Sequence, residues 1–558
     1  MIKNRYIIGV LSLLLVLFSI SLVVLPRIGI ESIKVKHSYV ERVFNQNKVT
    51  KVDIKVDDND LRSVLENPEA EKYVEATVEI DGTKVENVGL RTKGNLSLRS
   101  VVNIEDSERY SFKIDFDHYN SDQSLYGLKK LNLNNNYSDS TQMREYLSYK
   151  LMEKMGLPTP ANSYMYVTIN GKEWGLYLGI EQVDETFISR NFDNSIGDLY
   201  KPDGVGSDLQ WISDQIKDYP GLNLKTNNGT SDQTAMIEML AAINKGENIE
   251  QHIDVDEMLR YFAANTALVN LDSYQGQMKH NYYLYEQNGI FSIIPWDYNM
   301  SFGGFGVGGF GGGRGEANNE PVFNKEEKAA KGEEKRIIGP VGGELINEKN
   351  INLSITTPVT GTTMEARPLL NALLSVKEYR EKYEEYLEEI ATTFLTKDHI
   401  ESITTHVSKL VLPYVEKDPT KFYSTEEFLA GVTGEKSLPE FSIRRAESII
   451  KQLSGELVVE AEMEGQPERL PPNMDGNEKG ENWQPPQKGE WKGQAERGAP
   501  NFNNDKVSRE FGMPGQQGSN QQSPISGEIS TRNMIVSAGV FILLIAAIIF
   551  AFLFKRRR

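Results

Sequence analysis

The chain of 558 residues contains no cysteine and only six histidines. The absence of cysteine excludes disulfides, thiol catalysis and thiolate metal sites. A bound metal ion would therefore need oxygen ligands or one of the few histidines. Basic residues are also in deficit, because Asp and Glu exceed Lys and Arg by 79 − 61 = 18. This acidic balance argues against a nucleic-acid partner.

Long uncharged apolar runs are confined to the two ends of the chain. Residues 6–25 follow Lys3 and Arg5, and residues 534–554 precede a tail of one lysine and three arginines. A cleaved signal peptide is the alternative for the first run, but no small-x-small cleavage pattern is evident there, which favours an uncleaved anchor.

These runs predict a signal anchor within residues 1–31 and a transmembrane helix with a basic tail within residues 532–558. Basic flanks stay in the cytoplasm, so we expect both termini to be cytoplasmic. The predicted localisation is the cell membrane, with an extracytoplasmic central domain.

Two other segments lack the aliphatic residues that a folded core requires. Residues 461–531 are rich in Pro, Gly, Gln, Asn and Glu, which predicts a disordered linker because little surface is buried to offset chain entropy. A Gly-rich stretch that continues into a charged one predicts a loop insertion over about 303–336. The insertion lacks the G-x-x-x-x-G-K-[ST] pattern of a phosphate-binding loop. We interpret it as a flexible loop that follows a candidate metal site within residues 280–304.

The central region, residues 32–460, has strand patterns in its first half and mostly helix patterns in its second. In RYSFKIDFD, Phe112 and Ile114 fall on one face of a predicted strand. Asp-Gly at 81–82 and Asn-Gly at 170–171 each predict a hairpin turn. The predicted fold class is α+β, with a strand-rich lobe, a helical lobe and a ligand-binding cleft between them.

Residues 280–304, HNYYLYEQNGIFSIIPWDYNMSFGG, predict a hairpin that carries two oxygen-bearing side chains. The Asn-Gly pair at 288–289 favours the turn because both residues tolerate positive φ. Asn281 precedes the first strand and Asp297 follows the second, so both lie at the same end of the hairpin. Oxygen ligands are those that Mg²⁺ prefers. The hairpin therefore predicts a metal site, with an Asx turn as the structural alternative for Asp297.

A helix pattern leads directly to Asp272, which precedes Asn281 by nine residues. Protein kinases arrange a catalytic Asp, a metal-binding Asn, two short strands and a metal-binding Asp in this order. The kinase motifs themselves, G-x-G-x-x-G, H-R-D and D-F-G, are absent. Asp272 is a candidate catalytic residue, and a cap on the turn after its helix is the alternative.

Candidate nucleotide-binding residues lie upstream. Lys113, within a strand, precedes a helix that carries Glu145, which is the kinase order of a phosphate-binding Lys and its helical Glu partner. Arg91 and Lys93 lie near a predicted turn, where they are further candidates for phosphate contact. Glu153, on the same helix, is an alternative to Glu145, and each of the four candidates is also consistent with ordinary surface charge.

At these residues the sequence resembles the spore coat protein H (CotH) kinase-like family. The matching stretches lie between residues 89 and 304 and include GLRTKGN, FKIDF, MREYLSYKLMEKMGLPTP, VTINGKEWGLYLGIEQVDETFISRNF, DLYK and NLDSYQGQMKHNYYLY with IIPWDYNMSFGG. The resemblance implies an atypical protein-kinase-like two-lobed fold and transfer of phosphate from ATP, with Mg²⁺ or Mn²⁺, to protein Ser or Thr hydroxyls. It also implies a catalytic role for Asp272 and metal binding by Asp297. Many members have Asp-x-Asp after the Trp, whereas this chain has Asn299, an oxygen ligand without charge.

Two functions follow as hypotheses. The first is a surface-exposed atypical protein kinase that acts on proteins of the cell envelope or coat. The second is a surface adhesin or envelope-assembly scaffold that keeps the kinase-like fold without turnover. The predicted topology favours the scaffold, because free ATP is scarce outside cells. The residues favour the kinase, because a scaffold has no evident need for Lys113, Asp272 and Asp297 together.

Overall fold

The computed structural model describes residues 37–192, 195–305 and 346–459. The two predicted membrane anchors, the predicted linker and nearly all of the predicted insertion lie outside these residues. Among the residues that are described, no helix combines the length and the apolar character needed to span a membrane.

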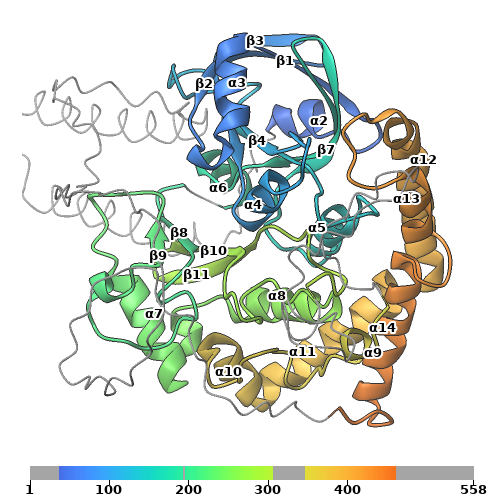
Figure 1. Cartoon of the computed structure of the whole chain (residues 1–558). Helices are drawn as coiled ribbons and strands as arrows, with labels where there is room; N and C mark the ends of the chain where they lie inside the picture. The colour runs from blue at the N-terminus through green and yellow to red at the C-terminus, as the bar shows by residue number, and fades with distance from the viewer. Residues whose placement is uncertain (1–36, 193–194, 306–345, 460–558) are drawn as a thin grey trace, which may run out of the picture. The chain divides into compact units, whose positions relative to one another are not determined.

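The first half of the described chain forms a closed barrel of seven strands (Figure 1). Their order around the barrel is β1-β2-β3-β4-β5-β7-β6, and β1 closes it by pairing in parallel with β6. The strands are β1 (Thr50–Val56), β2 (Val74–Ile80), β3 (Thr83–Lys93), β4 (Ser111–Asp115), β5 (Lys130–Asn134), β6 (Asn162–Ile169) and β7 (Lys172–Glu181). The strand-rich first half is therefore confirmed.

Local sequence explains the barrel's turns and its interior. The β2–β3 and β6–β7 connections are Asp81-Gly82 and Asn170-Gly171, and all four residues have positive φ, as predicted for such turns. On β4, Phe112 and Ile114 are fully buried in the barrel core, which confirms the predicted alternation.

Helices accompany the barrel strands: α2 (Ser38–Val43), α3 (Asp58–Glu66), the short η1 (Pro68–Ala70), α4 (Leu96–Val102) and α5 (Arg144–Lys154). The helix predicted to end at Gly156 is α5, and Gly156 has a φ of 70° just beyond it. No side chain at the N-cap position of α5 caps the helix; the Asp139 carboxylate instead accepts a hydrogen bond from the Arg144 amide at 2.8 Å.

A second sheet of four strands, ordered β11-β10-β8-β9, follows the barrel in sequence. Its strands are β8 (Asp198–Pro202), β9 (Leu222–Leu224), β10 (Tyr282–Gln287) and β11 (Ile290–Pro295). The predicted hairpin is β10–β11, with Tyr282 opposite Pro295 and the Asn288-Gly289 turn at the other end. Asn281 and Asp297 thus flank the same open end of the hairpin.

The remaining helices are α6 (Glu185–Asn191), η2 (Ile216–Asp218), α7 (Thr234–Lys245), η3 (Ile249–Gln251), α8 (Val255–Ala267), α9 (Glu348–Ile351), α10 (Pro368–Ser375), α11 (Lys377–Glu389), the π-helical η5 (Ile390–Phe394), α12 (Lys397–Lys417), α13 (Thr425–Val432) and α14 (Leu438–Leu453). Among them, α8 packs on β11 and α12 packs on the barrel strand β7. The buried apolar residues form one cluster inside the barrel and a larger one that spans α5, the second sheet and the helices. The mixed α+β class is confirmed.

After α12, residues 418–423 return to the barrel, and we call this segment the strap. Asp418 forms a buried ion pair with Arg109, with a Nη1–Oδ2 distance of 2.8 Å and side-chain exposures of 2% and 1%. Asp418 also accepts a hydrogen bond from the Leu176 amide on β7. Phe422 joins the barrel core. The strap therefore fastens the C-terminal helices to the strand-rich part.

Candidate active site

The open end of the β10–β11 hairpin holds its two polar residues in a left-handed backbone conformation. The φ angles are 60° at Asn281 and 56° at Asp297. Asn and Asp adopt this conformation more readily than other residues that carry a side chain. The hairpin end is the first feature of a candidate site because it holds an amide and a carboxylate at the same end of the hairpin.

Asp272 lies in the loop after α8 and contacts this hairpin end directly. Its Oδ1 is 2.7 Å from His280 Nε2, and its Oδ2 accepts a hydrogen bond of 3.1 Å from Asn281 Nδ2. The same Asn281 amide nitrogen also donates to the Asp272 carbonyl oxygen at 2.9 Å. Burial lowers the pKa of His280, but the Asp272 carboxylate outweighs this effect and raises it. Both carboxylate oxygens of Asp272 are thus held in a fixed orientation.

Asp297 has a buried oxygen without a partner. Within the described residues, Asp297 Oδ1 accepts no hydrogen bond although it is shielded from solvent. The Asp297 amide donates to the Tyr149 hydroxyl at 3.2 Å. Burial raises the pKa of the Asp297 carboxyl, Lys93 opposes this effect and Asp272 adds to it. A buried acceptor without a donor, in a site with other carboxylates, is suited to a cation.

Glu145, on α5, is 2% exposed and faces Asp297. Its carboxylate accepts hydrogen bonds from Asn134 Nδ2 at 2.9 Å and from the Tyr149 hydroxyl at 3.1 Å. Burial, followed by the charge of Asp297, raises the pKa of Glu145 to about 7. These contacts place Glu145 beside the metal-binding candidate.

The lysine next to Glu145 is Lys93, which differs from the predicted partner, Lys113. Lys93 Nζ donates to Asn134 Oδ1 at 2.6 Å, so Asn134 bridges Lys93 and Glu145. Burial lowers the pKa of Lys93, and Asp297 and then Glu145 oppose that shift. The reason lies in the register: Lys93, at the end of β3, is opposite Ser111, two residues before Lys113 on β4.

Lys113 Nζ instead donates to Gln182 Oε1 at 2.9 Å. Burial, with the nearby positive charges of Arg91, Lys130 and Lys93, lowers the pKa of Lys113 to about 7. On the neighbouring strands Lys113 is opposite Arg91 on one side and Asn132 on the other. The barrel therefore presents a row of polar side chains on the face opposite Phe112.

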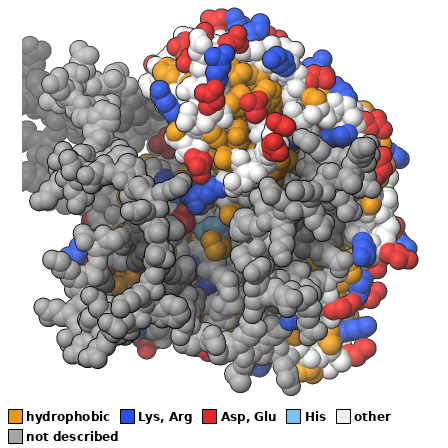
Figure 2. Space-filling model, viewed as in Figure 1, with side chains coloured by type: hydrophobic (Ala, Val, Ile, Leu, Met, Phe, Trp, Pro, Cys, Tyr) orange, Lys and Arg blue, Asp and Glu red, His pale blue; other side chains and the backbone are white. Residues whose placement is uncertain are grey.

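Arg91 makes stronger contacts with neighbouring side chains than Lys93 and Lys113 do. Its guanidinium forms an ion pair with Glu71 and lies over the Tyr73 ring, 5.2 Å from its centroid. Phosphate contact by Arg91 stays a prediction. Figure 2 shows Lys and Arg side chains gathered where the barrel meets the second sheet, beside a histidine.

The residues present fit a divalent cation through oxygen ligands. Asn281 uses its amide nitrogen to bind Asp272, which leaves its Oδ1 available as a ligand. Asn299 follows Asp297 by two residues and is half-buried. In the described part of the chain no group of three or more His, Cys, Asp or Glu residues is arranged to hold a metal ion. A site here would therefore rely on Asp297 with amide oxygens.

Sequence reasoning missed two residues of this region. It assigned no functional role to His280, whose ring contacts the Asp272 carboxylate. It gave no role to Lys201 on β8, which acts electrostatically on both Asp297 and Lys93. For His280, its position next to Asn281 was an available signal; the placement of Lys201 needs the order of strands in the second sheet.

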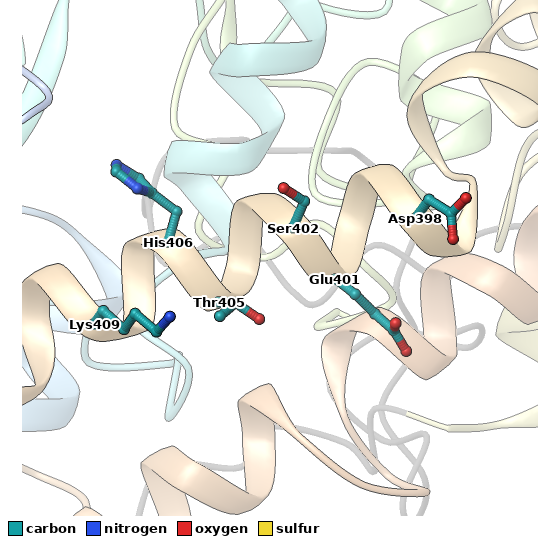
Figure 3. Close-up of a pocket in the computed structure, with 6 residues that line it drawn as sticks. All are labelled: Asp398, Glu401, Ser402, Thr405, His406 and Lys409. Atoms are coloured by element: carbon teal, nitrogen blue, oxygen red, sulfur yellow. The ribbon is translucent and has the colours of Figure 1, made fainter.

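Two hollows elsewhere on the molecule hold none of these candidates. One, of about 500 Å³, lies along one face of α12 and is lined from Asp398 to Lys409 (Figure 3). Its six lining residues all come from that helix, and Figure 3 shows them spread along its length. The other, of about 470 Å³, lies between the end of α5 and the β10–β11 turn, where the buried Glu257 is among its lining residues. The candidate site lies in neither hollow, and it is defined by the contacts among its side chains.

Asp297→Ala should weaken Mg²⁺-dependent ATP binding by roughly 10- to 100-fold, because a charged oxygen ligand is lost. The free energy of unfolding should stay level or rise, since a buried carboxylate near Glu145 is removed. Calorimetric ATP titrations with and without Mg²⁺, together with thermal unfolding, measure both effects. Asp232→Ala, at an exposed position, is the control. Unchanged Mg²⁺-dependent binding would make Asp297 structural.

The affinity for metal-free ATP should fall as the pH rises from 7 to 9. Only protonated Lys113 attracts phosphate, and its pKa in the free protein is about 7. Bound phosphate raises that pKa, so binding takes up a proton and weakens with rising pH, by at most about tenfold per pH unit for one proton. Lys113→Met should remove most of the dependence. Equal slopes for the two proteins would contradict a phosphate-binding role.

Comparison with known proteins identifies the family of this chain. The family model described as CotH kinase protein matches residues 90–452, well over half of the chain. Inner spore coat protein H of Bacillus subtilis (strain 168) is 24% identical over 396 residues, covering 69% of this chain and 92% of the relative. An inner spore coat protein H-like protein of the same organism is 36% identical over 75 residues, or 13% of this chain and 23% of that protein. The match spans β3 to α14 and includes every candidate residue, and the chain therefore belongs to the CotH kinase protein family.

Proposed function

We propose that this chain is an atypical protein kinase that transfers phosphate from ATP to Ser or Thr hydroxyls of envelope or coat proteins. The observation that carries the proposal is the geometry of Asp272. Its two oxygens are held by His280 and Asn281, and the partnerless oxygen of Asp297 lies in the same cluster. Kinase-type transfer needs an oriented carboxylate, oxygen ligands for a metal ion and cationic side chains for the phosphates, all close together.

Asp297 is the charged ligand of Mg²⁺ or Mn²⁺ in this proposal, with Asn281 and Asn299 as amide-oxygen ligands. When bound, the metal ion neutralises charge on the ATP phosphates. Lys93 and Lys113 approach the phosphates from the barrel, and Arg91 contributes to the positive field behind them.

Asp272 accepts the proton of the acceptor hydroxyl in the transfer step. The hydroxyl oxygen forms a bond to the γ-phosphorus, the bond between that phosphorus and the β–γ bridging oxygen breaks, and ADP leaves with the electron pair. His280 keeps the Asp272 carboxylate aimed by its hydrogen bond. The protein thus contributes positioning and electrostatic stabilisation.

The proposed location is the cell surface, with the membrane contacted through both termini. The apolar runs at residues 6–25 and 534–554 and their basic flanks support this location. The name of the Bacillus subtilis relative, inner spore coat protein H, supports coat proteins as substrates. ATP would then have to reach the outer face of the membrane.

Transfer of labelled phosphate from ATP by the full purified chain tests the function. The assay includes Mg²⁺ or Mn²⁺, the chain itself as acceptor, and generic Ser- and Thr-containing proteins. We expect label on Ser or Thr that depends on the metal. A chain that binds ATP but labels no acceptor would favour the scaffold hypothesis.

A further inference from the structure

A hydrogen-bonded bridge connects the barrel to the second sheet at the candidate site. Lys113 Nζ donates to Gln182 Oε1 at 2.9 Å, and Gln182 Nε2 donates to the Tyr283 hydroxyl at 3.3 Å. At the far end of the bridge, Lys201 Nζ lies over the Tyr283 ring, 5.7 Å from its centroid. Two lysines from different sheets therefore occupy the two ends of one Gln–Tyr bridge.

Of the cationic side chains near the candidate site, Lys201 has the fewest polar partners. Lys93 and Lys113 each donate to a side-chain amide, and Arg91 is paired with Glu71. Within the described residues, Lys201 forms no ion pair or hydrogen bond through its ammonium group, and its side-chain contact is with an aromatic face. An ammonium group that has neither is available for an anionic ligand.

The position of Lys201 is on the Asp272 side of the site. It belongs to β8, which pairs with β10, the strand that follows Asn281. Asp203, two residues further along the chain, is close enough to His280 to raise its pKa, and His280 contacts Asp272. Lys113, on the barrel, lies at the opposite end of the bridge.

We propose that Lys201 binds the terminal phosphate of the nucleotide and makes the site prefer a nucleoside triphosphate over a diphosphate. This inference rests on the proposed function. The phosphate that is transferred must be next to the carboxylate that receives the acceptor proton, so the cation on the Asp272 side meets the terminal phosphate. Lys113, at the other end of the bridge, then contacts a phosphate that a diphosphate also has.

The preference can be measured as the ratio of ADP to ATP dissociation constants in the presence of Mg²⁺, with the full chain. Lys201→Met should weaken ATP binding by about 10- to 100-fold, the range for one charge-assisted hydrogen bond. ADP binding should change less than about twofold, because ADP lacks the group that Lys201 contacts. Lys201→Arg should restore most of the ratio, since it keeps the charge.

Lys225→Met is the matched control. Lys225 lies just beyond β9, is exposed, and is close enough to Lys201 to feel its charge. It should leave both dissociation constants unchanged if the effect of Lys201 is a contact and not the general field. Equal weakening of ADP and ATP by Lys201→Met, or no weakening of either, would overturn the assignment. A parent chain that binds neither nucleotide would overturn the proposed function, and this inference with it.

Discussion

Asp272→Asn should reduce phosphate transfer by about 10² to 10⁴-fold, the usual contribution of a positioned acid–base group. ATP affinity should stay within about threefold of the parent, because Asp272 acts on the acceptor hydroxyl and not on the nucleotide. The His280 and Asn281 side chains remain to pack against the amide, so the local fold should survive. Single-turnover transfer and calorimetric ATP binding separate the two effects.

The control for this change is Asp256→Asn. Asp256 lies in the first turn of α8, is largely exposed and pairs with Arg260, so its loss should leave transfer unaffected. If Asp272→Asn transfers phosphate as fast as the parent, Asp272 is not the base, although the kinase proposal itself survives. A parallel loss of ATP binding would assign Asp272 to the nucleotide instead.

Arg109→Met should lower the free energy of unfolding by about 3–5 kcal/mol, the cost of leaving one charge of a buried pair without its partner. The Asp418 carboxylate would keep its hydrogen bond from the Leu176 amide but lose the guanidinium. Four other acceptors of Arg109 would also lose this donor: the carbonyl oxygens of Asn135, Trp174 and Leu176 and the Thr420 hydroxyl. Urea unfolding followed by tryptophan fluorescence measures the change through its midpoint.

A second variant separates the charge from the packing. Arg109→Met combined with Asp418→Leu should recover part of the lost stability, because no unpaired buried charge remains. The exposed pair of Lys377 and Glu381 serves as the comparison, and Lys377→Met should cost no more than about 0.5 kcal/mol. A cost that small for Arg109→Met would mean that water reaches the strap.

Local patterns in the sequence predicted a large part of this structure. Hairpin turns at Asn170-Gly171 and Asn288-Gly289 were correct because two adjacent residues that tolerate positive φ fix the turn and the strand register together. That register then placed Asn281 and Asp297 at one end of the hairpin. The nine-residue spacing of Asp272 and Asn281 did not predict the contact that their side chains make, because it depends on the path of the loop between them.

The pairing of Lys93 with Glu145 through Asn134 lay beyond sequence reasoning. Three strands must be aligned before the distances of Lys93 and Lys113 from α5 can be compared, and periodicity gives the face of a residue but not its neighbour across the sheet. The Arg109–Asp418 pair is an extreme case, with a sequence separation of 309 residues. No sequence pattern around Arg109 or around Asp418 indicates that the two residues form a pair.

The strap also limits how far the C-terminal helices can move against the barrel. Two-lobed enzymes often admit nucleotide by rotating one lobe against the other about a hinge. Here such a rotation would pull Asp418 from Arg109 and Phe422 from the barrel core, at a cost of several kcal/mol. ATP should therefore enter through rearrangement of side chains and short loops around a rigid frame.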